Sequence, residues 1–251
     1  STLQKVNPDV VINCAGLTKH KAEAENPLEI LPVNGMLPHR LANCCELIGA
    51  RLIHISTDCV FSGKKGNYKE DDFADANDLY GRSKVLGEKL SQNHLTLRIS
   101  TIGHELNTKY GLLEWFLSQD RECQGFTKAI FSGFPTVVFA QILKEIILPN
   151  MDLTGLYHVA SEPIAKYDLL KMIAHKYKKD IEIIPNDTAI IDRSLNNQRF
   201  YNATSYTAPS WPEMINKMYD YDCRMKDNFK NESSDLEEKS FLEYEMKSTL
   251  A

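Results

Sequence analysis

The segment that most constrains the fold is a short apolar run at residues 51–55, RLIHI, which is followed directly by Ser56, Thr57 and Asp58. A run rich in branched apolar side chains is typical of a strand that is buried on both faces. Ligands bind at the carboxyl ends of strands in an open parallel sheet. The three polar residues therefore lie where a binding site is expected.

Other segments repeat this strand signal and alternate with helical patterns. Strands are predicted at residues 9–15 (DVVINCA) and 95–100 (LTLRIS), and helices at residues 29–48 and 80–90. Gly49 is a suitable C-cap for the helix at 29–48, and Pro32 and Pro38 are expected to bend or divide it. Strands that alternate with helices predict an α/β protein with a doubly wound parallel sheet of the Rossmann type.

The second half of the chain carries further elements. The predicted elements are helices at 110–117, 136–147, 166–177 and 211–225 and strands at 155–161 and 181–185. His158 alternates with apolar neighbours, so we interpret it as a core histidine. From residue 226 the sequence is strongly polar, which is typical of a solvated helix or a disordered arm.

Composition excludes several classes of protein. The net charge of -5 and the pI of about 5.8 argue against a general nucleic-acid binder. No apolar run approaches the roughly 20 residues that span a bilayer, and no signal peptide is evident, so a cytoplasmic location without membrane insertion is expected. No spacing of a metal site is present, and free thiols are favoured over a disulfide framework for six cysteines: Cys14, Cys44, Cys45, Cys59, Cys123 and Cys223.

Tyr80 and Lys84 are the first candidates for chemistry outside the strand end. Asp78 can cap the helix that contains them, and the spacing of four places both side chains on one helical face. A nearby ammonium favours the phenolate, so we expect Lys84 to lower the pKa of Tyr80 from its ordinary value of about 10. A Tyr-x-x-x-Lys pair is also common on plain helix surfaces. The Ser-Thr-Asp strand end upstream favours the catalytic interpretation.

These motifs together carry a family resemblance. The sequences STDCVFSG and YGRSKVLGE, with the acidic loop YKEDD between them, resemble the extended short-chain dehydrogenases/reductases. More narrowly, they are similar to dTDP-4-dehydrorhamnose reductases and related sugar-nucleotide reductases. The resemblance extends from about Pro8 to about Pro212.

The resemblance implies roles for the motif residues. Tyr80 would be the proton donor, Lys84 would hold the nicotinamide ribose, and Thr57 would polarise the substrate carbonyl. NADPH or NADH would be the cofactor, and its site would include Cys14, Ala15, Gly16, Ser56, Tyr80 and Lys84. We interpret Cys14 as a packed residue. Asn34 corresponds to an asparagine of the family with either a structural or a proton-relay role.

The resemblance also implies a nucleotide-sugar substrate. Its contacts would include Lys19, His20, Asp58, His104 and Arg193. Residues 1–128 would form the cofactor-binding domain and residues 129–225 mainly the substrate-binding region, with the strand at 155–161 returning to the main sheet. Thr101 stands where related reductases usually have an aromatic residue.

One expected feature is not found in this sequence. No Gly-x-x-Gly-x-x-Gly or Gly-x-Gly-x-x-Gly turn precedes the strand at residues 9–15. Such a turn, with the helix after it, holds the cofactor pyrophosphate. Two βα units of the family are therefore expected upstream, and we favour a fragment over a protein that lacks the phosphate cradle.

The functional hypothesis is an NAD(P)H-dependent reductase of a nucleotide-linked 4-keto-6-deoxy sugar. It would act in the biosynthesis of activated sugars and surface polysaccharides. A homodimer is one expected assembly. Epimerase or dehydratase chemistry on the same residues is an alternative. A non-catalytic regulatory or binding subunit with the same fold is another.

Overall fold

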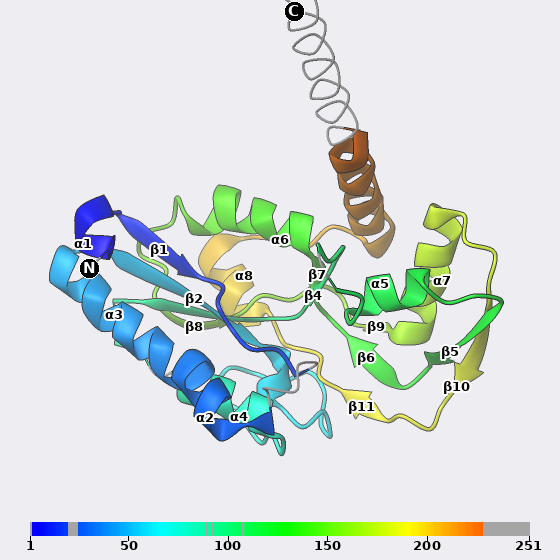
Figure 1. Ribbon diagram of the computed structural model, residues 1–251, viewed down its shortest axis with the longest axis horizontal. Helices are drawn as coiled ribbons and strands as arrows, with labels where there is room; N and C mark the ends of the chain where they lie inside the picture. Colours follow the sequence, from blue (N-terminus) through cyan, green and yellow to red (C-terminus); the bar gives the residue numbers. More distant parts are fainter. Residues whose placement is uncertain (1, 20–24, 89, 92, 107, 228–251) are drawn as a thin grey trace, which may run out of the picture.

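The main sheet is parallel, as the sequence predicts. The computed structural model describes residues 2–19, 25–88, 90–91, 93–106 and 108–227. Within these residues the largest sheet contains, in spatial order, β1 (Val10–Asn13), β2 (Arg51–Thr57), β3 (Leu95–Ile99) and β8 (Gly155–His158). Each strand runs parallel to its neighbour. Figure 1 shows this sheet in the left half of the molecule.

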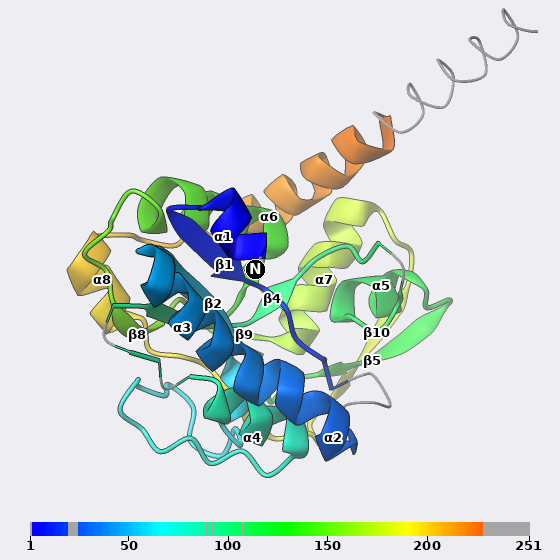
Figure 2. The same cartoon turned by 60° about the vertical axis from the view of Figure 1, so that its left-hand side comes forward.

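Helices cover both faces of the sheet. The α-helices are α1 (Thr2–Val6), α2 (Pro27–Ile30), α3 (Leu37–Ile48), α4 (Leu79–Leu86), α5 (Leu112–Leu117), α6 (Thr136–Ile142), α7 (Lys166–Tyr177), α8 (Gln198–Thr204) and a last helix at 211–227. In Figure 1, α3 and α4 lie below the sheet and α6 lies above it; Figure 2 shows the same layers after rotation.

The apolar run of β2 explains why both faces are covered. Successive strand residues face opposite sides of a sheet. Leu52 packs with Cys45 of α3, whereas Ile53 belongs to the large cluster that includes Val138 of α6. Leu52 and Ile53 are fully buried. Full burial of such a side chain contributes about 1.5–3 kcal/mol, so the run stabilises both layers at once.

The helix predicted at residues 29–48 is divided, and the prolines give the reason. α2 is followed by a π-helical segment, η2 (Leu31–Met36), and only then by α3. Pro38 has no backbone N–H to donate to the carbonyl four residues earlier, which belongs to Asn34. Gly49 ends α3 with a φ of 71°, the left-handed C-cap that the sequence predicts.

Several element boundaries differ from the prediction. The strand predicted at 9–15 spans only Val10–Asn13, and the helix predicted at 80–90 ends at Leu86, where Gly87 is the C-cap. The predicted N-cap is confirmed, because the Asp78 side chain accepts a hydrogen bond from the N–H of Gly81 at 2.6 Å. The segment 143–147 continues α6 as a second π-helical turn, η4 (Leu143–Ile147).

The second half of the chain builds three small sheets beside the main one. The strands are β4 (Thr101–Ile102) with β7 (Phe134–Pro135), β5 (Glu122–Phe126) with β10 (Glu182–Asn186), and β6 (Ala129–Phe131) between β11 (Ile191–Asp192) and β9 (Ile164–Ala165). They lie in the right half of Figure 1, with α5 and α7 beside them. One continuous apolar cluster joins these elements to Ile53 and Leu97 of the main sheet.

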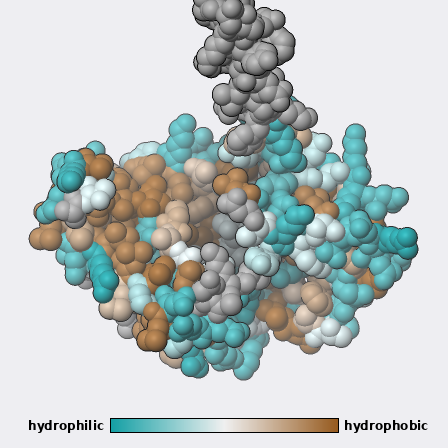
Figure 3. Space-filling model, viewed as in Figure 1, coloured by the Kyte–Doolittle hydropathy of each residue, from teal (hydrophilic) through white to brown (hydrophobic). Residues whose placement is uncertain are grey.

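Apolar side chains are exposed around β1, which lies at the edge of the main sheet. Figure 3 shows them as a brown area over the left half of the molecule. Exposed residues of α1, β1, α2, η2 and α3 are Val6, Ile12, Leu28, Met36 and Leu47. In the described part of the chain, no helix is both long enough and apolar enough to cross a bilayer.

His158 is a core residue, as the sequence indicates. It is fully buried; its Nδ1 lies 3.0 Å from the Tyr68 carbonyl, and its Nε2 lies 3.2 Å from Nη1 of Arg98. The guanidinium donates to Nε2, so the neutral ring carries its hydrogen on Nδ1. Burial, with the Arg98 charge next in importance, lowers the pKa of His158 to about 3. His54 of β2 is also fully buried, and burial lowers its pKa to about 3.

Acid should therefore destabilise the fold through these two histidines. Their pKa is about 6.5 in the unfolded chain and about 3 in the folded one. The unfolded state then binds more protons below pH 6.5, and stability falls by about 1.4 kcal/mol per pH unit and histidine. Urea unfolding at pH 7.0, 6.0 and 5.0 should show a loss of about 4 kcal/mol between pH 7.0 and 5.0.

His158→Asn should halve the part of this slope that is due to histidine. His175→Asn, on α7 and outside this network, is the matched control. Equal slopes for the two variants would contradict the assignment.

Candidate active site

The carboxyl ends of the parallel strands open into one cavity of about 460 Å³. Its walls come from the segments after β1, β2 and β3, from α4, and from the small sheets. The lining residues are 14–19, 55–59, Tyr80, Lys84, 99–102, Gly111, Leu112, 129–131, Lys166, Ile191 and Arg193. The cavity is thus located where the sequence places the site.

Thr57 and Tyr80 meet in this cavity. Thr57 is the last residue of β2, and its hydroxyl is hydrogen-bonded to the Tyr80 hydroxyl. Thr57 Oγ1 also lies 3.1 Å from Asp58 Oδ1, to which it donates, and accepts the Cys59 N–H at 3.1 Å. The threonine hydroxyl is therefore held in place beside the phenol.

Lys84 lies one helical turn from Tyr80 and lines the same cavity. Its side chain is almost completely buried, and Nζ donates to the Ile55 carbonyl of β2 at 2.7 Å. An ammonium has three donors. Within the described residues, the bond to Ile55 uses one of these three donors, so two N–H groups of Lys84 remain for a ligand.

The pKa values correct one expectation. Lys84 was expected to lower the pKa of Tyr80, but burial raises that pKa above its ordinary value, with Cys59 and Asp58 adding to the increase. Burial also lowers the pKa of Lys84 to about 8, against opposing effects of Glu88 and Cys14. Loss of solvent outweighs the attraction of a single cation here. Tyr80 is therefore a neutral phenol, the form that donates a proton.

Asn34 has a structural role in this arrangement. It is buried; its Oδ1 accepts the Leu17 N–H at 2.9 Å, and its Nδ2 donates to the Leu17 carbonyl at 2.9 Å and to Ser83 Oγ at 3.1 Å. Ser83 Oγ in turn donates to the Tyr80 carbonyl at 2.7 Å. Asn34 thus fixes the segment after β1 against the helix that carries Tyr80.

Ser56 points away from this chemistry. Its hydroxyl donates to Glu88 Oε1 at 2.5 Å. Glu88 forms a buried ion pair with Arg98, in which Nη2 and Oε2 are 2.8 Å apart. What Ser56 presents to the cavity is therefore its backbone.

The other predicted site residues line the cavity, lie outside the described residues, or lie elsewhere in the fold. Cys14, Ala15, Gly16, Lys19, Asp58 and Arg193 line the cavity. Cys14 is exposed, so its interpretation as a packed residue is wrong: β1 ends one residue earlier, at Asn13. His20 lies outside the described residues.

His104 is placed elsewhere. It is absent from the described cavity lining; its Nδ1 lies 2.6 Å from Glu114 Oε1 and its Nε2 lies 2.9 Å from the Tyr177 hydroxyl. The ring is held between α5 and α7 by these two partners, so His104 has a structural place in this structure.

Lys166 is a charged residue of the cavity lining that the sequence does not mark as a site residue. It is the first residue of α7 and directly follows β9. The sequence indicates the helix start but gives no sign that this side chain, among several lysines of the helix, faces the cavity.

The residues present fit the ribose side of a nicotinamide cofactor. Lys84 offers ammonium donors to hydroxyl oxygens, and Ala15 and Gly16 are small enough for close approach. A Cβ on Gly16 would lie 3.3 Å from Asn34 Oδ1, so the backbone is close-packed here. The 251 residues contain no glycine-rich turn for the pyrophosphate. The described residues also hold no cluster of three or more side chains able to bind a metal ion.

Comparison with known proteins identifies relatives of this chain. A family model described as RmlD substrate binding domain matches residues 1–220. The dTDP-4-dehydrorhamnose reductase of Aggregatibacter actinomycetemcomitans is 27% identical over 227 residues, which are 86% of this chain and 73% of that protein. The Escherichia coli K12 enzyme of the same name is 29% identical over 223 residues, 83% of this chain and 70% of that protein.

Solved structures share the fold. The crystal structure of dTDP-4-dehydrorhamnose reductase from Bacillus anthracis in complex with NADP superimposes with a TM-score of 0.74. The two sequences are 23% identical, and the match covers 87% of this chain and 82% of that one. The doubly wound, Rossmann-like α/β architecture is therefore that of this chain as well.

Replacing Asn34 should test its role as a clamp. Asn34→Ala removes three hydrogen bonds and leaves the Leu17 N–H and carbonyl without these partners, so we expect a loss of about 2–4 kcal/mol in the free energy of unfolding. Urea unfolding measures this loss. Asn202→Ala, on the exposed side of α8, is the control and should change stability by less than about 0.5 kcal/mol. Similar losses for both variants would argue against the clamp.

Proposed function

The chain belongs to the RmlD substrate-binding domain family, and we propose on that basis that it is an NAD(P)H-dependent reductase of a nucleotide-linked 4-keto-6-deoxy sugar. The observation that carries the proposal is the convergence of Thr57, Tyr80 and Lys84 in one cavity at the carboxyl ends of parallel strands. The named activity of the relatives, dTDP-4-dehydrorhamnose reductase, supports the substrate class.

In this proposal Tyr80 donates a proton to the substrate oxygen. Its raised pKa supports the direction, because a protonated phenol is ready to donate. The Thr57 hydroxyl, held in place by the Cys59 N–H, turns its one hydrogen from Asp58 to the same oxygen when substrate binds and stabilises the charge that develops there. A bound nicotinamide cofactor supplies the hydride.

Lys84 holds the cofactor ribose and keeps a positive charge beside the reacting groups. Cys14, Ala15, Gly16 and the backbone of Ser56 complete that side of the cavity in the proposal. Lys19, Asp58 and Arg193 contact the substrate. We also propose that residues 1–128 bind mainly the cofactor and residues 129–225 mainly the sugar, in a cytoplasmic enzyme.

The protonated phenol of Tyr80 fits a reductase better than an epimerase or dehydratase. An epimerase or dehydratase that begins by oxidising a hydroxyl needs Tyr80 as a base, and burial disfavours the phenolate. A non-catalytic subunit has no use for a hydroxyl, a phenol and an ammonium aligned in one cavity.

Turnover tests the proposal directly. The full-length protein mixed with NADPH and a dTDP-4-keto-6-deoxy sugar should consume one NADPH per sugar, measured by absorbance at 340 nm. Tyr80→Phe should lower kcat by about 10²- to 10⁴-fold with a much smaller change in KM. No turnover with either dTDP- or UDP-linked substrates would refute the proposal, and turnover without net NADPH loss would indicate an epimerase or dehydratase.

The rate should depend on pH through Lys84. With a pKa of about 8, its ammonium is charged below pH 8 and loses its proton above it. We therefore expect kcat/KM to be high at pH 6.5–7.5 and to fall as the pH rises through about 8. Lys84→Arg keeps its charge and should remove the inflection while lowering the maximum rate. An unchanged inflection in this variant would assign the titration to another group.

A further inference from the structure

Three cationic side chains line the cavity beyond Tyr80. Lys19 follows β1, Lys166 begins α7, and Arg193 directly follows β11. The Lys166 ammonium interacts electrostatically with Lys19, Arg193, Asp58 and Cys59. Lys84 has a different set of neighbours, Glu88 and Cys14. The cavity therefore has two cationic regions with different neighbours.

The positions of these cations are set by neutral contacts. Arg193 Nε donates to the Phe61 carbonyl at 2.8 Å, and Lys19 Nζ lies 4.0 Å from Cys59 Sγ. Gly63, with a φ of 87°, lets the chain pass close to Arg193, because a Cβ there would lie 3.1 Å from Arg193 Cγ. The guanidinium is thus held by its Nε, and no described residue accepts a hydrogen bond from its two Nη groups, which can bind a ligand.

Protein carboxylates do not neutralise the group. Among the described residues, none of the three cations has a carboxylate oxygen within 4.0 Å. Asp58 is the nearby acid, and its Oδ1 is occupied by the Thr57 hydroxyl. Burial lowers the pKa of Lys166, and repulsion from Lys19 and Arg193 lowers it further. Three positive charges and one negative charge leave a net charge of +2. The cations therefore repel one another, and a bound dianion would offset this repulsion.

The chemistry of the group fits a diphosphate diester. Such a group carries two negative charges and spaced oxygens that cations from three segments can contact, and a guanidinium binds phosphate oxygens bidentately. Cys59 is an electrostatic neighbour of both Lys166 and Tyr80. The anion region therefore begins beside the proton donor, as a sugar attached directly to the diphosphate requires.

We propose that Lys166 is a substrate-binding residue that, with Arg193 and Lys19, holds the diphosphate of the nucleotide-linked sugar. This inference rests on the proposed function and deepens it. The diphosphate connects the segment after β1 with the start of α7 and the end of β11. A nucleoside diphosphate alone therefore binds and stabilises the protein without turnover, and the corresponding nucleoside does not.

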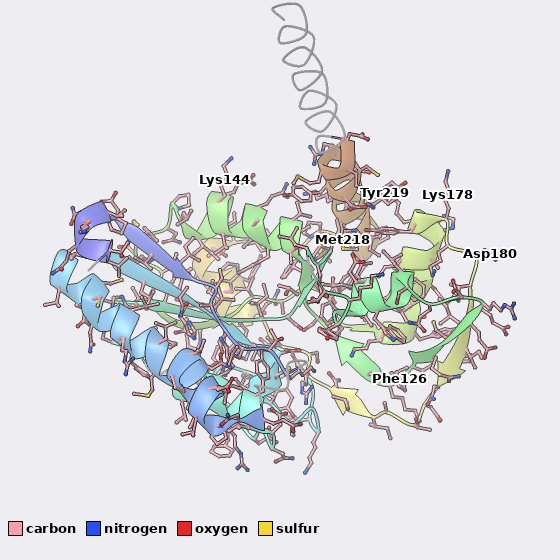
Figure 4. All side chains as sticks on the ribbon, viewed as in Figure 1. Phe126, Lys144, Lys178, Asp180, Met218 and Tyr219 are labelled. Atoms are coloured by element: carbon pink, nitrogen blue, oxygen red, sulfur yellow. The ribbon has the colours of Figure 1, made fainter. Side chains whose placement is uncertain are left out.

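Calorimetry on the full chain tests the role of Lys166, with dTDP and thymidine as probes. Lys166→Gln should weaken dTDP binding about 10- to 100-fold, the range for loss of one charge-assisted contact. Lys166→Arg should retain most of the affinity. Lys171→Gln is the matched control: Lys171 lies on the same helix but lines a different groove together with Tyr219. Tyr219, labelled in Figure 4, belongs to the 211–227 helix. The affinity of Lys171→Gln for dTDP should equal that of the unaltered protein.

A second variant guards against a folding artefact. Lys19→Gln removes a cation from another segment and should also weaken dTDP binding while the melting temperature without ligand stays the same. Raising NaCl from 50 to 300 mM should weaken dTDP binding to the unaltered protein more than binding to Lys166→Gln.

The outcomes separate this inference from the proposed function. Equal dTDP affinity in Lys166→Gln and Lys171→Gln, or thymidine binding as tight as dTDP binding, would overturn the diphosphate assignment even if NADPH is consumed. Lys166-dependent dTDP binding without any NADPH consumption would support the diphosphate region and refute the reductase.

Discussion

The buried ion pair between Glu88 and Arg98 connects the parts of the structure on which the site depends. Arg98 belongs to β3, and its Nε and Nη2 donate to the two carboxylate oxygens of Glu88, which follows α4. Ser56 of β2 donates to the same carboxylate, and His158 of β8 accepts from the guanidinium. Three adjacent strands and the helix of Tyr80 are thereby fixed to one another. Because strand residues alternate in direction, Ser56 can face this anchor while Thr57, the next residue, faces the cavity.

Local patterns in the sequence were sufficient for the scaffold. The apolar run before Ser56 predicted a buried strand, the alternation of elements predicted the parallel sheet, and Asp78 and Gly49 marked helix ends correctly. Such features depend on a few residues that are neighbours in the sequence, so the sequence alone is enough to predict them. The Tyr80 and Lys84 spacing belongs to the same class, since four residues of helix place two side chains on one face.

Properties that depend on distant contacts were not predictable in this way. The pKa of Tyr80 follows from how completely the phenol is buried, and that requires knowledge of all the segments around it. His104 has partners 10 and 73 residues away, and Lys166 interacts with residues that precede it by more than 100 positions. Cys14 is exposed because β1 ends two residues earlier than its apolar pattern indicated.

The return of β8 to the main sheet has a consequence for how the protein can be taken apart. The chain leaves the sheet after β3 and forms the strands β4 to β7. It then comes back to pair β8 with β3 in register from Leu95 to Arg98. It leaves again to form β9, β10 and β11. A single break in the backbone therefore cannot release the substrate-side elements as an intact module, and a recombinant exchange of that region needs at least two joints. The two halves should accordingly lose their structure together in one cooperative transition.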